Sequence, residues 1–118
     1  MFKTILVPVD LTDRHDKALA TAVELAGPGG EVALVHVVAL ISGLEEEKTF
    51  YARLERIARE HLNRYGQGLA GRQVRWRAKV LLGVPVEETV GYAAELPADL
   101  IVLTSPRFDP DKPYEGWG

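Results

Sequence analysis

The sequence contains no cysteine, and this absence excludes disulfide bonds, thiolate metal sites and catalysis by a thiol. Long hydrophobic runs are also missing, since the longest apolar stretches, "ILVPV" (5–9) and "VALVHVVALI" (32–41), are too short to span a bilayer. No membrane insertion is therefore expected. The amino terminus, "MFKTILVPVD", carries one lysine and lacks a small-residue cleavage site. It has no signal-peptide pattern, so the cytoplasm is the default location.

Glycine-rich phosphate-binding loops are absent where an α/β enzyme would carry them. The segment after the first hydrophobic run, "PVDLTD" (8–13), holds neither G-x-G-x-x-G nor G-x-x-x-x-G-K-[ST]. It also lacks the serine and glycines of an ATP-pyrophosphatase loop. A response regulator is excluded as well, because the third expected strand runs into "KVLLGVP" (79–85) without a phosphoacceptor aspartate.

What the chain does contain is an ordinary globular composition with an uneven charge distribution. Its 118 residues, 47% hydrophobic and 26% charged, suffice for one domain with a core. The net charge is −3, yet residues 48–79 hold nine Lys or Arg against two Glu. Such a segment can mark an anionic partner, although a solvated helix face beside a charged edge strand explains it more simply. No recognition helix or aromatic–basic interleaving is present, so nucleic-acid binding is not expected.

Strand-like and helix-like segments alternate along the chain. Strands are expected at Phe2–Val9, Glu31–Val38, Gln73–Val80 and 98–104. A first helix is expected from about Thr12 or Asp13 to the turn at 27–30, and either of these two residues could cap it. A second helix is expected from the loop at 41–47 to about Tyr65, and a third from Pro85 onward. The third strand alternates polar and apolar residues and is expected at an edge, whereas the wholly apolar fourth strand is expected to be central.

This order predicts a three-layer α/β fold, with helices packed on both sides of an open parallel sheet. Ligands of such folds bind beyond the carboxyl ends of the strands, where the strand order switches. The first of these ends presents Asp10, whose carboxylate could accept a hydrogen bond from a base amino group or a ribose hydroxyl. Asp10 could equally cap the following helix, and the spacing alone leaves both interpretations open.

No metal site and no catalytic residue are predicted from the remaining polar side chains. Asp10, Asp13, His15 and Asp16 lie close together in the sequence, but Asp13 and Asp16 are better explained as acids at a helix start. His36 falls inside a strand and is expected to be a packed, hydrogen-bonded histidine. Neither serine, at positions 42 and 105, lies in a nucleophile-elbow context.

Taken in order, these segments resemble the universal stress protein family. The resemblance is carried by "ILVPVDLT" (5–12), "VALVHVV" (32–38) and "GVPVEETVGYAAELPADLIVLTS" (83–105), and it covers essentially the whole chain. It implies a Rossmann-like fold of the adenine nucleotide alpha hydrolase type with strand order 3-2-1-4-5. Here the order would be 3-2-1-4, with the fifth strand missing. The domain would comprise residues 1–104, and a proline-rich tail at 105–118 would replace the phosphate-binding loop, final helix and strand.

The resemblance also implies which residues would hold an adenine nucleotide. Pro8, Val9 and Asp10 would line the ribose and base, Val37 would offer backbone atoms to the adenine, and Leu103 would close over the base. The implied cofactor is ATP or AMP, with no metal beyond magnesium accompanying a nucleotide.

The family's phosphate motif, G-x-x-G-x(9)-G-[ST], is altered in this chain. Its register puts Thr104 at the first glycine and Arg107 at the second, and Gly118 falls near the third. Arg107 could replace the glycine amides as a phosphate-binding cation, or the proline-rich loop could bar the phosphates. We expect weakened or absent triphosphate binding.

The function that the resemblance implies is a non-enzymatic regulatory module of the stress response. It would act as a homodimer if the carboxyl-terminal strand is present, or through a protein partner that the sequence does not identify. A fourth strand left as an apolar edge suggests that the natural chain continues or that another segment covers it. The alternatives are an interaction module that binds no nucleotide and, with less support, an enzyme that hydrolyses ATP slowly.

Overall fold

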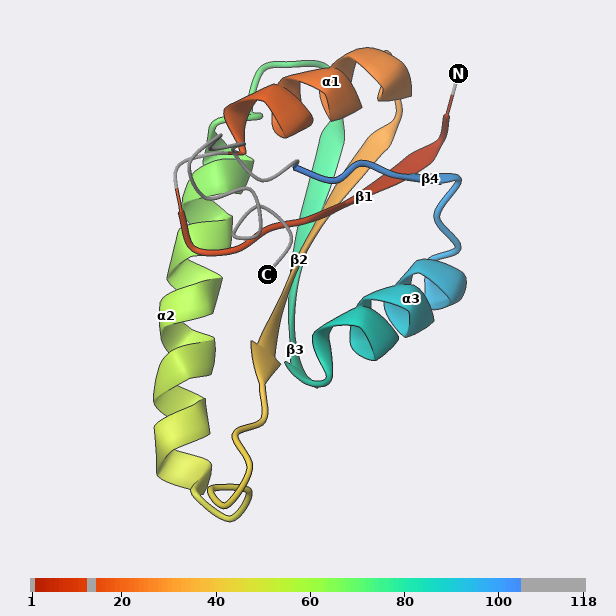
Figure 1. Cartoon of the computed structure of the whole chain (residues 1–118). Coiled ribbons are helices and arrows are strands. Elements are labelled where there is room, and N and C mark those ends of the chain that lie inside the picture. Colours follow the sequence, from red (N-terminus) through yellow and green to blue (C-terminus); the bar gives the residue numbers. More distant parts are fainter. Residues whose placement is uncertain (1, 13–14, 105–118) are drawn as a thin grey trace, which may run out of the picture.

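Strands and helices alternate along the chain, as the sequence predicts (Figure 1). A computed structural model describes residues 2–12 and 15–104. The strands are β1 (Thr4–Pro8), β2 (Glu31–Ala39), β3 (Arg75–Gly83) and β4 (Leu100–Ile101). The helices are α1 (Asp16–Ala26), α2 (Lys48–Gln67) and α3 (Pro85–Glu95). In the described ranges, no helix is both long and apolar enough to cross a membrane.

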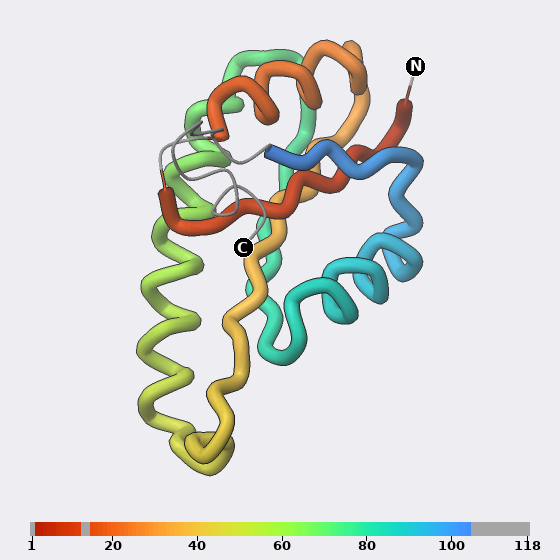
Figure 2. The backbone as a smooth tube through the Cα atoms, viewed as in Figure 1, coloured from red at the N-terminus to blue at the C-terminus, as the bar shows by residue number. Residues whose placement is uncertain are grey.

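The four strands form one parallel sheet in the order β3-β2-β1-β4, which confirms the predicted topology. β1 lies between β2 and β4, with Leu6 opposite both Ala33 and Ile101. The first and last described segments therefore run side by side, although about 90 residues separate them in sequence (Figure 2). This arrangement places the carboxyl ends of β1, β2 and β4 next to one another at one end of the sheet.

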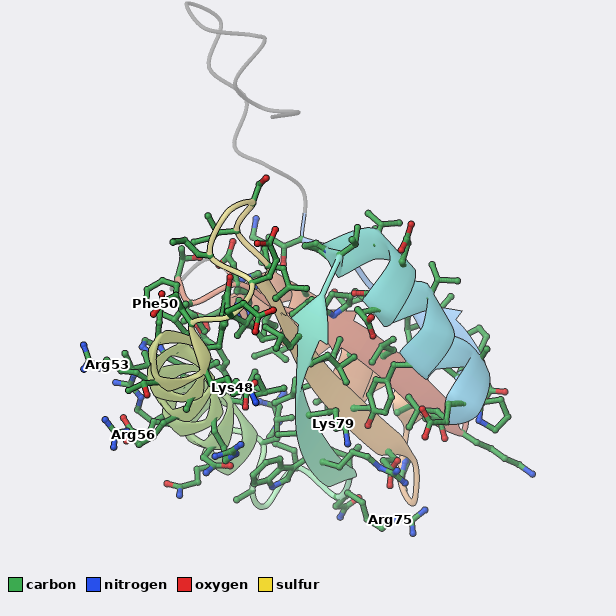
Figure 3. All side chains as sticks on the ribbon, turned by 90° about the horizontal axis from the view of Figure 1, so that it is seen from below. Lys48, Phe50, Arg53, Arg56, Arg75 and Lys79 are labelled. Carbon is green, nitrogen blue, oxygen red and sulfur yellow. The ribbon has the colours of Figure 1, made fainter. Side chains whose placement is uncertain are left out.

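Helices cover both faces of the sheet, as expected for strands that are apolar on both sides. α2 and α3 lie on opposite sides of the strands (Figure 3). Alternate strand residues accordingly enter two cores. The first core contains the strand residues Ile5, Val7, Val32 and Leu34 together with Leu62 of α2. The second contains Leu6, Ala33 and Val35 together with Tyr92 of α3.

Two expectations about element positions are wrong. α1 begins at Asp16 and has no side-chain cap, rather than beginning at Thr12 or Asp13. Of the residues between β1 and α1, Val9, Asp10 and His15 instead line the candidate site. β4 is only two residues long and forms the edge of the sheet in the described part of the chain, so it is not central there. The expected edge position of β3 is confirmed.

Trp76 packs beneath α2 because a glycine leaves room for its ring. A Cβ added to Gly66, in the last turn of α2, would lie 2.2 Å from Cζ3 of Trp76. Glycine is unfavourable in a helix interior, so its presence here reflects close approach rather than helix propensity. The contact ties α2 to the edge strand β3.

Asp99 fastens the start of β4 to the start of β1. Its carboxylate Oδ2 accepts hydrogen bonds from the backbone N–H groups of Thr4, at 2.9 Å, and Lys3, at 2.8 Å. These two bonds, that from Thr4 first, lower the pKa of Asp99 below its ordinary value of 3.8. The short ladder of β4 is thus extended by a charged side chain.

We expect Gly66→Ala to destabilise the protein by about 1–3 kcal/mol, because the new methyl group overlaps the Trp76 ring. Gly91→Ala in α3 is the matched control, since a Cβ there meets nothing within 4 Å. That control should gain about 0.5–1 kcal/mol from helix propensity. Urea unfolding of both variants measures the two effects. A Gly66→Ala variant as stable as the wild type would contradict the close approach.

Asp99→Asn should lower the melting temperature at neutral pH and lose its effect in acid. Because the pKa of Asp99 is lowered in the folded state, its contribution is present above the unfolded value of 3.8 and is lost as the pH falls through the folded value. Melting curves of both proteins from neutral pH to about pH 3 should therefore converge. A constant difference across that range would mean that the charge is not involved.

Candidate functional site

A cavity opens where the carboxyl ends of β1, β2 and β4 meet the start of α3. Its volume is about 290 Å³. Its wall consists of residues from β1, β2 and α3, from the segment between β1 and α1, and from the segment after β4. They are Pro8, Val9, Asp10, His15, Val35, His36, Val37, Pro85, Thr89, Leu103 and Thr104. The cavity therefore lies at the carboxyl ends of the strands, where ligands of open α/β folds bind.

The structure brings six of the sequence-predicted site residues together in this cavity. The six are Pro8, Val9, Asp10, Val37, Leu103 and Thr104. They come from three segments that are distant in the sequence, so their convergence depends on the strand order β2-β1-β4. The other two predicted positions, Arg107 and Gly118, lie outside the described residues.

Asp10 organises the loop after β1 rather than capping α1. Its Oδ1 accepts a hydrogen bond from the Thr12 backbone N–H at 3.0 Å, and the Thr12 hydroxyl donates to the same oxygen. Bonds to the residue two positions on are typical of an Asx turn. The interpretation of Asp10 as a helix cap is therefore wrong, since α1 begins six residues later. Its carboxylate faces the cavity instead.

His15 joins the end of β1 to the end of β4. Only 3% of its surface is exposed. Nδ1 lies 2.6 Å from Oγ1 of Thr104, and Nε2 lies 2.8 Å from Oδ1 of Asp10. The Asp10 backbone N–H also points at Nε2, at 3.0 Å. When Nε2 carries a proton it donates to the carboxylate, and when it does not it accepts from the backbone. We call Asp10, His15 and Thr104 the clasp.

Sequence reasoning missed the role of His15, which it treated only as a member of a weak metal cluster. The available signal was a histidine five residues after a strand-end aspartate, and this spacing does not reveal Thr104, 89 residues away. In the described ranges no three His, Asp or Glu side chains converge as metal ligands. The prediction of no metal site explained Asp13 and Asp16 as acids at a helix start. Asp16 does lie in the first turn of α1, whereas Asp13 lies outside those ranges.

Tyr65 supports the clasp from the opposite side of the loop. Its hydroxyl donates to the carbonyl of Thr12 and lies 3.4 Å from the carbonyl of Asp10. Its ring meets that of His15 edge-on, with centroids 6.2 Å apart. The helical spacing predicts Tyr65 as a core residue of α2, and the structure adds a polar role to that packing.

His36 is hydrogen-bonded, as predicted, but it also lines the cavity. Its Nδ1 lies 2.8 Å from the carbonyl oxygen of Val9. Since a carbonyl only accepts, Nδ1 carries the proton in this contact. The bond holds the end of β1 against β2, next to the backbone hydrogen bond from Val9 N–H to the Val35 carbonyl at 2.8 Å.

A second, apolar hollow of about 310 Å³ adjoins the first. It is lined by Pro8, Pro85, Val86, Thr89, Ile101 and Leu103. Leu103 and Val86 are 69% and 73% exposed, which is unusual for large apolar side chains. The site thus combines a polar wall formed by the clasp with an apolar wall formed by β4 and α3.

The described side chains of the cavity supply a set of groups suited to ligand recognition. None of the described cavity residues is Lys or Arg, so these residues contribute no cation to a phosphate. They do provide a carboxylate, two imidazoles, a hydroxyl and apolar surface, which suit a neutral ring carrying hydrogen-bonding groups.

Comparisons with known proteins agree with this description. The sequence profile of the Universal stress protein family matches residues 1–109. The universal stress protein UspA from Lactobacillus plantarum is 26% identical, with a TM-score of 0.70 over 86% of this chain and 75% of that chain. A universal stress protein family member from Burkholderia pseudomallei is 28% identical, with a TM-score of 0.65 over 87% and 81%.

A universal stress protein in complex with cAMP shares the fold at 24% identity, with a TM-score of 0.52 over 86% of this chain and 75% of that chain. Comparison with curated protein sequences gives no significant match.

The clasp should stabilise the fold measurably. His15→Phe keeps a ring against Tyr65 but removes the hydrogen bonds, and should cost about 1–3 kcal/mol. Thr104→Val should cost about 1 kcal/mol, and the double variant should cost less than the sum, because the two side chains share one contact. His61→Phe on the half-buried side of α2 is the control, with an effect within about 0.5 kcal/mol. Additive costs in urea unfolding would show that His15 and Thr104 are not coupled.

Proposed function

The chain belongs to the universal stress protein family, and on that premise we propose that it is a regulatory module of the stress response that binds an adenine nucleotide in the clasp cavity. The observation that carries this proposal is the convergence of Pro8, Val9, Asp10, Val37 and Leu103 on one cavity. These five residues come from separate segments, and the family resemblance assigns all of them to the nucleotide.

The chemistry of the wall fits a nucleoside. The Asp10 carboxylate can accept from ribose hydroxyls, and the apolar surface of Leu103 and Pro8 can cover a base. The volume of about 290 Å³ lies just below the range of about 300–1,000 Å³ that ligand pockets span. A nucleoside or monophosphate therefore suits the cavity better than a triphosphate.

Phosphate recognition is the weaker half of this proposal. No lysine or arginine lines the described cavity, and the position of the family's first phosphate-loop glycine holds Thr104, which is engaged by His15. We therefore propose that affinity is set by the adenosine moiety, with AMP, ADP and ATP bound alike. Because a universal stress protein of the same fold is known in complex with cAMP, the cyclic nucleotide is a further candidate.

The rest of the proposal concerns how the module acts. We infer a non-enzymatic role and, where the carboxyl-terminal strand is present, pairing into homodimers, as the family resemblance implies. The cytoplasm is the default location, because the amino terminus has no signal-peptide pattern. The tail at 105–118 would replace the phosphate-binding loop. A bound nucleotide would alter the conformation of the clasp and of the neighbouring apolar surface, and a partner protein would recognise the altered surface.

A second candidate function is an interaction module without a nucleotide. The exposure of Val86, Val90 and Leu103 beside the cavity favours it, because apolar surface of this kind often marks a protein contact. The two functions differ in whether purified protein responds to adenosine compounds.

Titration with adenosine, AMP, cAMP, ADP and ATP tests the first function. Calorimetry should give similar affinities for AMP and ATP, and Asp10→Asn should weaken them at least about tenfold by removing the carboxylate charge while keeping an acceptor for Thr12. Asp16→Asn, the same change at an exposed position of α1, should leave binding unaltered.

Equal loss of affinity in Asp10→Asn and Asp16→Asn would contradict the assigned site. Affinity that rises strongly from AMP to ATP would contradict adenosine-dominated binding. The absence of heat and of thermal stabilisation with every compound at millimolar concentration would exclude the nucleotide and favour the interaction module.

A further inference from the structure

Among the described residues, nothing pairs with the outer edge of β3 along its whole length. β3 pairs with β2 over nine residues, Arg75–Gly83, and within the described ranges no strand lies on its other side. α2 packs against β3, and Figure 3 shows the helix to one side of the strand. An open edge of this length is a template for a further strand.

The alternation of backbone hydrogen bonds identifies which groups point outward. Arg75 N–H donates to the Gly30 carbonyl of the neighbouring segment, and the Gly83 carbonyl accepts from Leu40 N–H. In a parallel strand the N–H and C=O of one residue point to the same side, and successive residues alternate. Odd-numbered residues of β3 therefore bond to β2. The outward groups belong to Trp76, Ala78, Val80 and Leu82.

Cations line this edge on one face of the sheet. Arg75 and Lys79 are exposed on β3, between them lies Arg77, and Figure 3 shows Arg75 and Lys79 on the strand. Arg77 pairs with Glu31, the distance from Nε to Oε1 being 2.7 Å, and this pairing raises its pKa. Arg75 and Lys79 form no ion pair with any described residue.

The charge of the neighbouring helix is also uncompensated. Arg53, Arg56, Arg59 and Arg64 on α2 form no ion pairs within the described part of the chain, although Glu55 and Glu60 stand four residues before Arg59 and Arg64. Salt bridges within the helix, the usual explanation for many charges on a helix surface, therefore do not account for these arginines. The cations of α2 are therefore not neutralised by the described acids of the helix, although only those on β3 lie at the edge itself.

Near the far end of the strand the charge changes sign. Leu82 shares a hollow of about 400 Å³ with Lys48, Glu45 and Glu55. The basic part of the edge thus runs from Arg75 to Lys79, and a complementary segment would carry its acids opposite those residues.

We propose that the outer edge of β3 is a docking site for an extended acidic segment of a partner protein, which adds to the sheet as a further strand. The free N–H and C=O groups of Trp76, Ala78 and Val80 supply main-chain hydrogen bonds. Arg75 and Lys79 supply charge complementarity on one face. The added segment would alternate acidic residues beside these cations with apolar residues on the face of Trp76.

Other occupants fit this edge less well. A second copy would place Arg75 and Lys79 beside the same cations, since both edges carry like charge. Nucleic acid would satisfy the cations, but its phosphates accept hydrogen bonds and would leave the outward carbonyls of Ala78 and Val80 without donors. A polypeptide strand alone offers alternating donors and acceptors.

The test uses a capped, fluorescent peptide, Glu-Val-Glu-Val-Glu-Val-Glu, and its Lys-Val counterpart with the full-length chain. We expect saturable anisotropy binding of the acidic peptide only, weakening as salt rises. Arg75→Glu combined with Lys79→Glu should weaken it by roughly tenfold or more and admit the Lys-Val peptide. The control pair, Lys17→Glu with Arg53→Glu, makes the same charge change away from the edge and should leave binding intact.

A backbone variant and an exchange measurement separate strand addition from simple charge attraction. Ala78→Pro removes an outward N–H that β2 does not use, so the fold should persist by circular dichroism while peptide binding is lost. In the wild type, the peptide should slow hydrogen exchange of the Ala78 and Val80 amides. Binding without that protection, no saturable binding, or preference for a DNA oligonucleotide of equal charge would each overturn the proposal.

Discussion

The buried imidazole of His15 is the constraint on which the candidate site depends. β4 shares only two residues of ladder with β1, which is too short to fix the segment that follows it. The contact between His15 and Thr104 continues the attachment past the last ladder pair, and Asp99 provides the equivalent at the other end. Together with the backbone hydrogen bond from Val102 N–H to the Leu6 carbonyl, these two side-chain bridges hold Leu103 as a wall of the cavity. These side-chain hydrogen bonds therefore provide attachment that a longer β4 would provide through backbone pairing.

The parts of the fold that the sequence predicts well are those set by local pattern. Apolar runs at 4–9 and 31–39 mark strands buried on both faces, and Pro85 marks the start of α3, where its missing N–H costs nothing. The start of α1 escapes such patterns. Thr12 resembles a helix cap, but its backbone N–H and hydroxyl bind Asp10, and this competition delays the helix to Asp16.

The residues of the candidate site also differ in how well the sequence predicts them. Asp10 follows directly from a strand end, whereas Pro8, Val9, Val37 and Leu103 follow from resemblance to a family with this strand order. The roles of His15 and of the Tyr65 hydroxyl could not be predicted in either way, because each group contacts a partner more than 50 residues away in the sequence. Contacts of that separation depend on how helices settle on the sheet, and a short hydrophobic pattern carries no information about it.

The uneven placement of charge has a consequence for how the molecule behaves near any charged surface. Nine cations and two anions between positions 48 and 79 oppose the acidic remainder, so a molecule of net charge −3 carries a substantial electric dipole moment. In the field of a negatively charged matrix it would turn the side bearing α2 and β3 toward the surface. A cation-exchange resin would then retard the protein above its isoelectric point of about 5.6, where net charge alone predicts that it flows through.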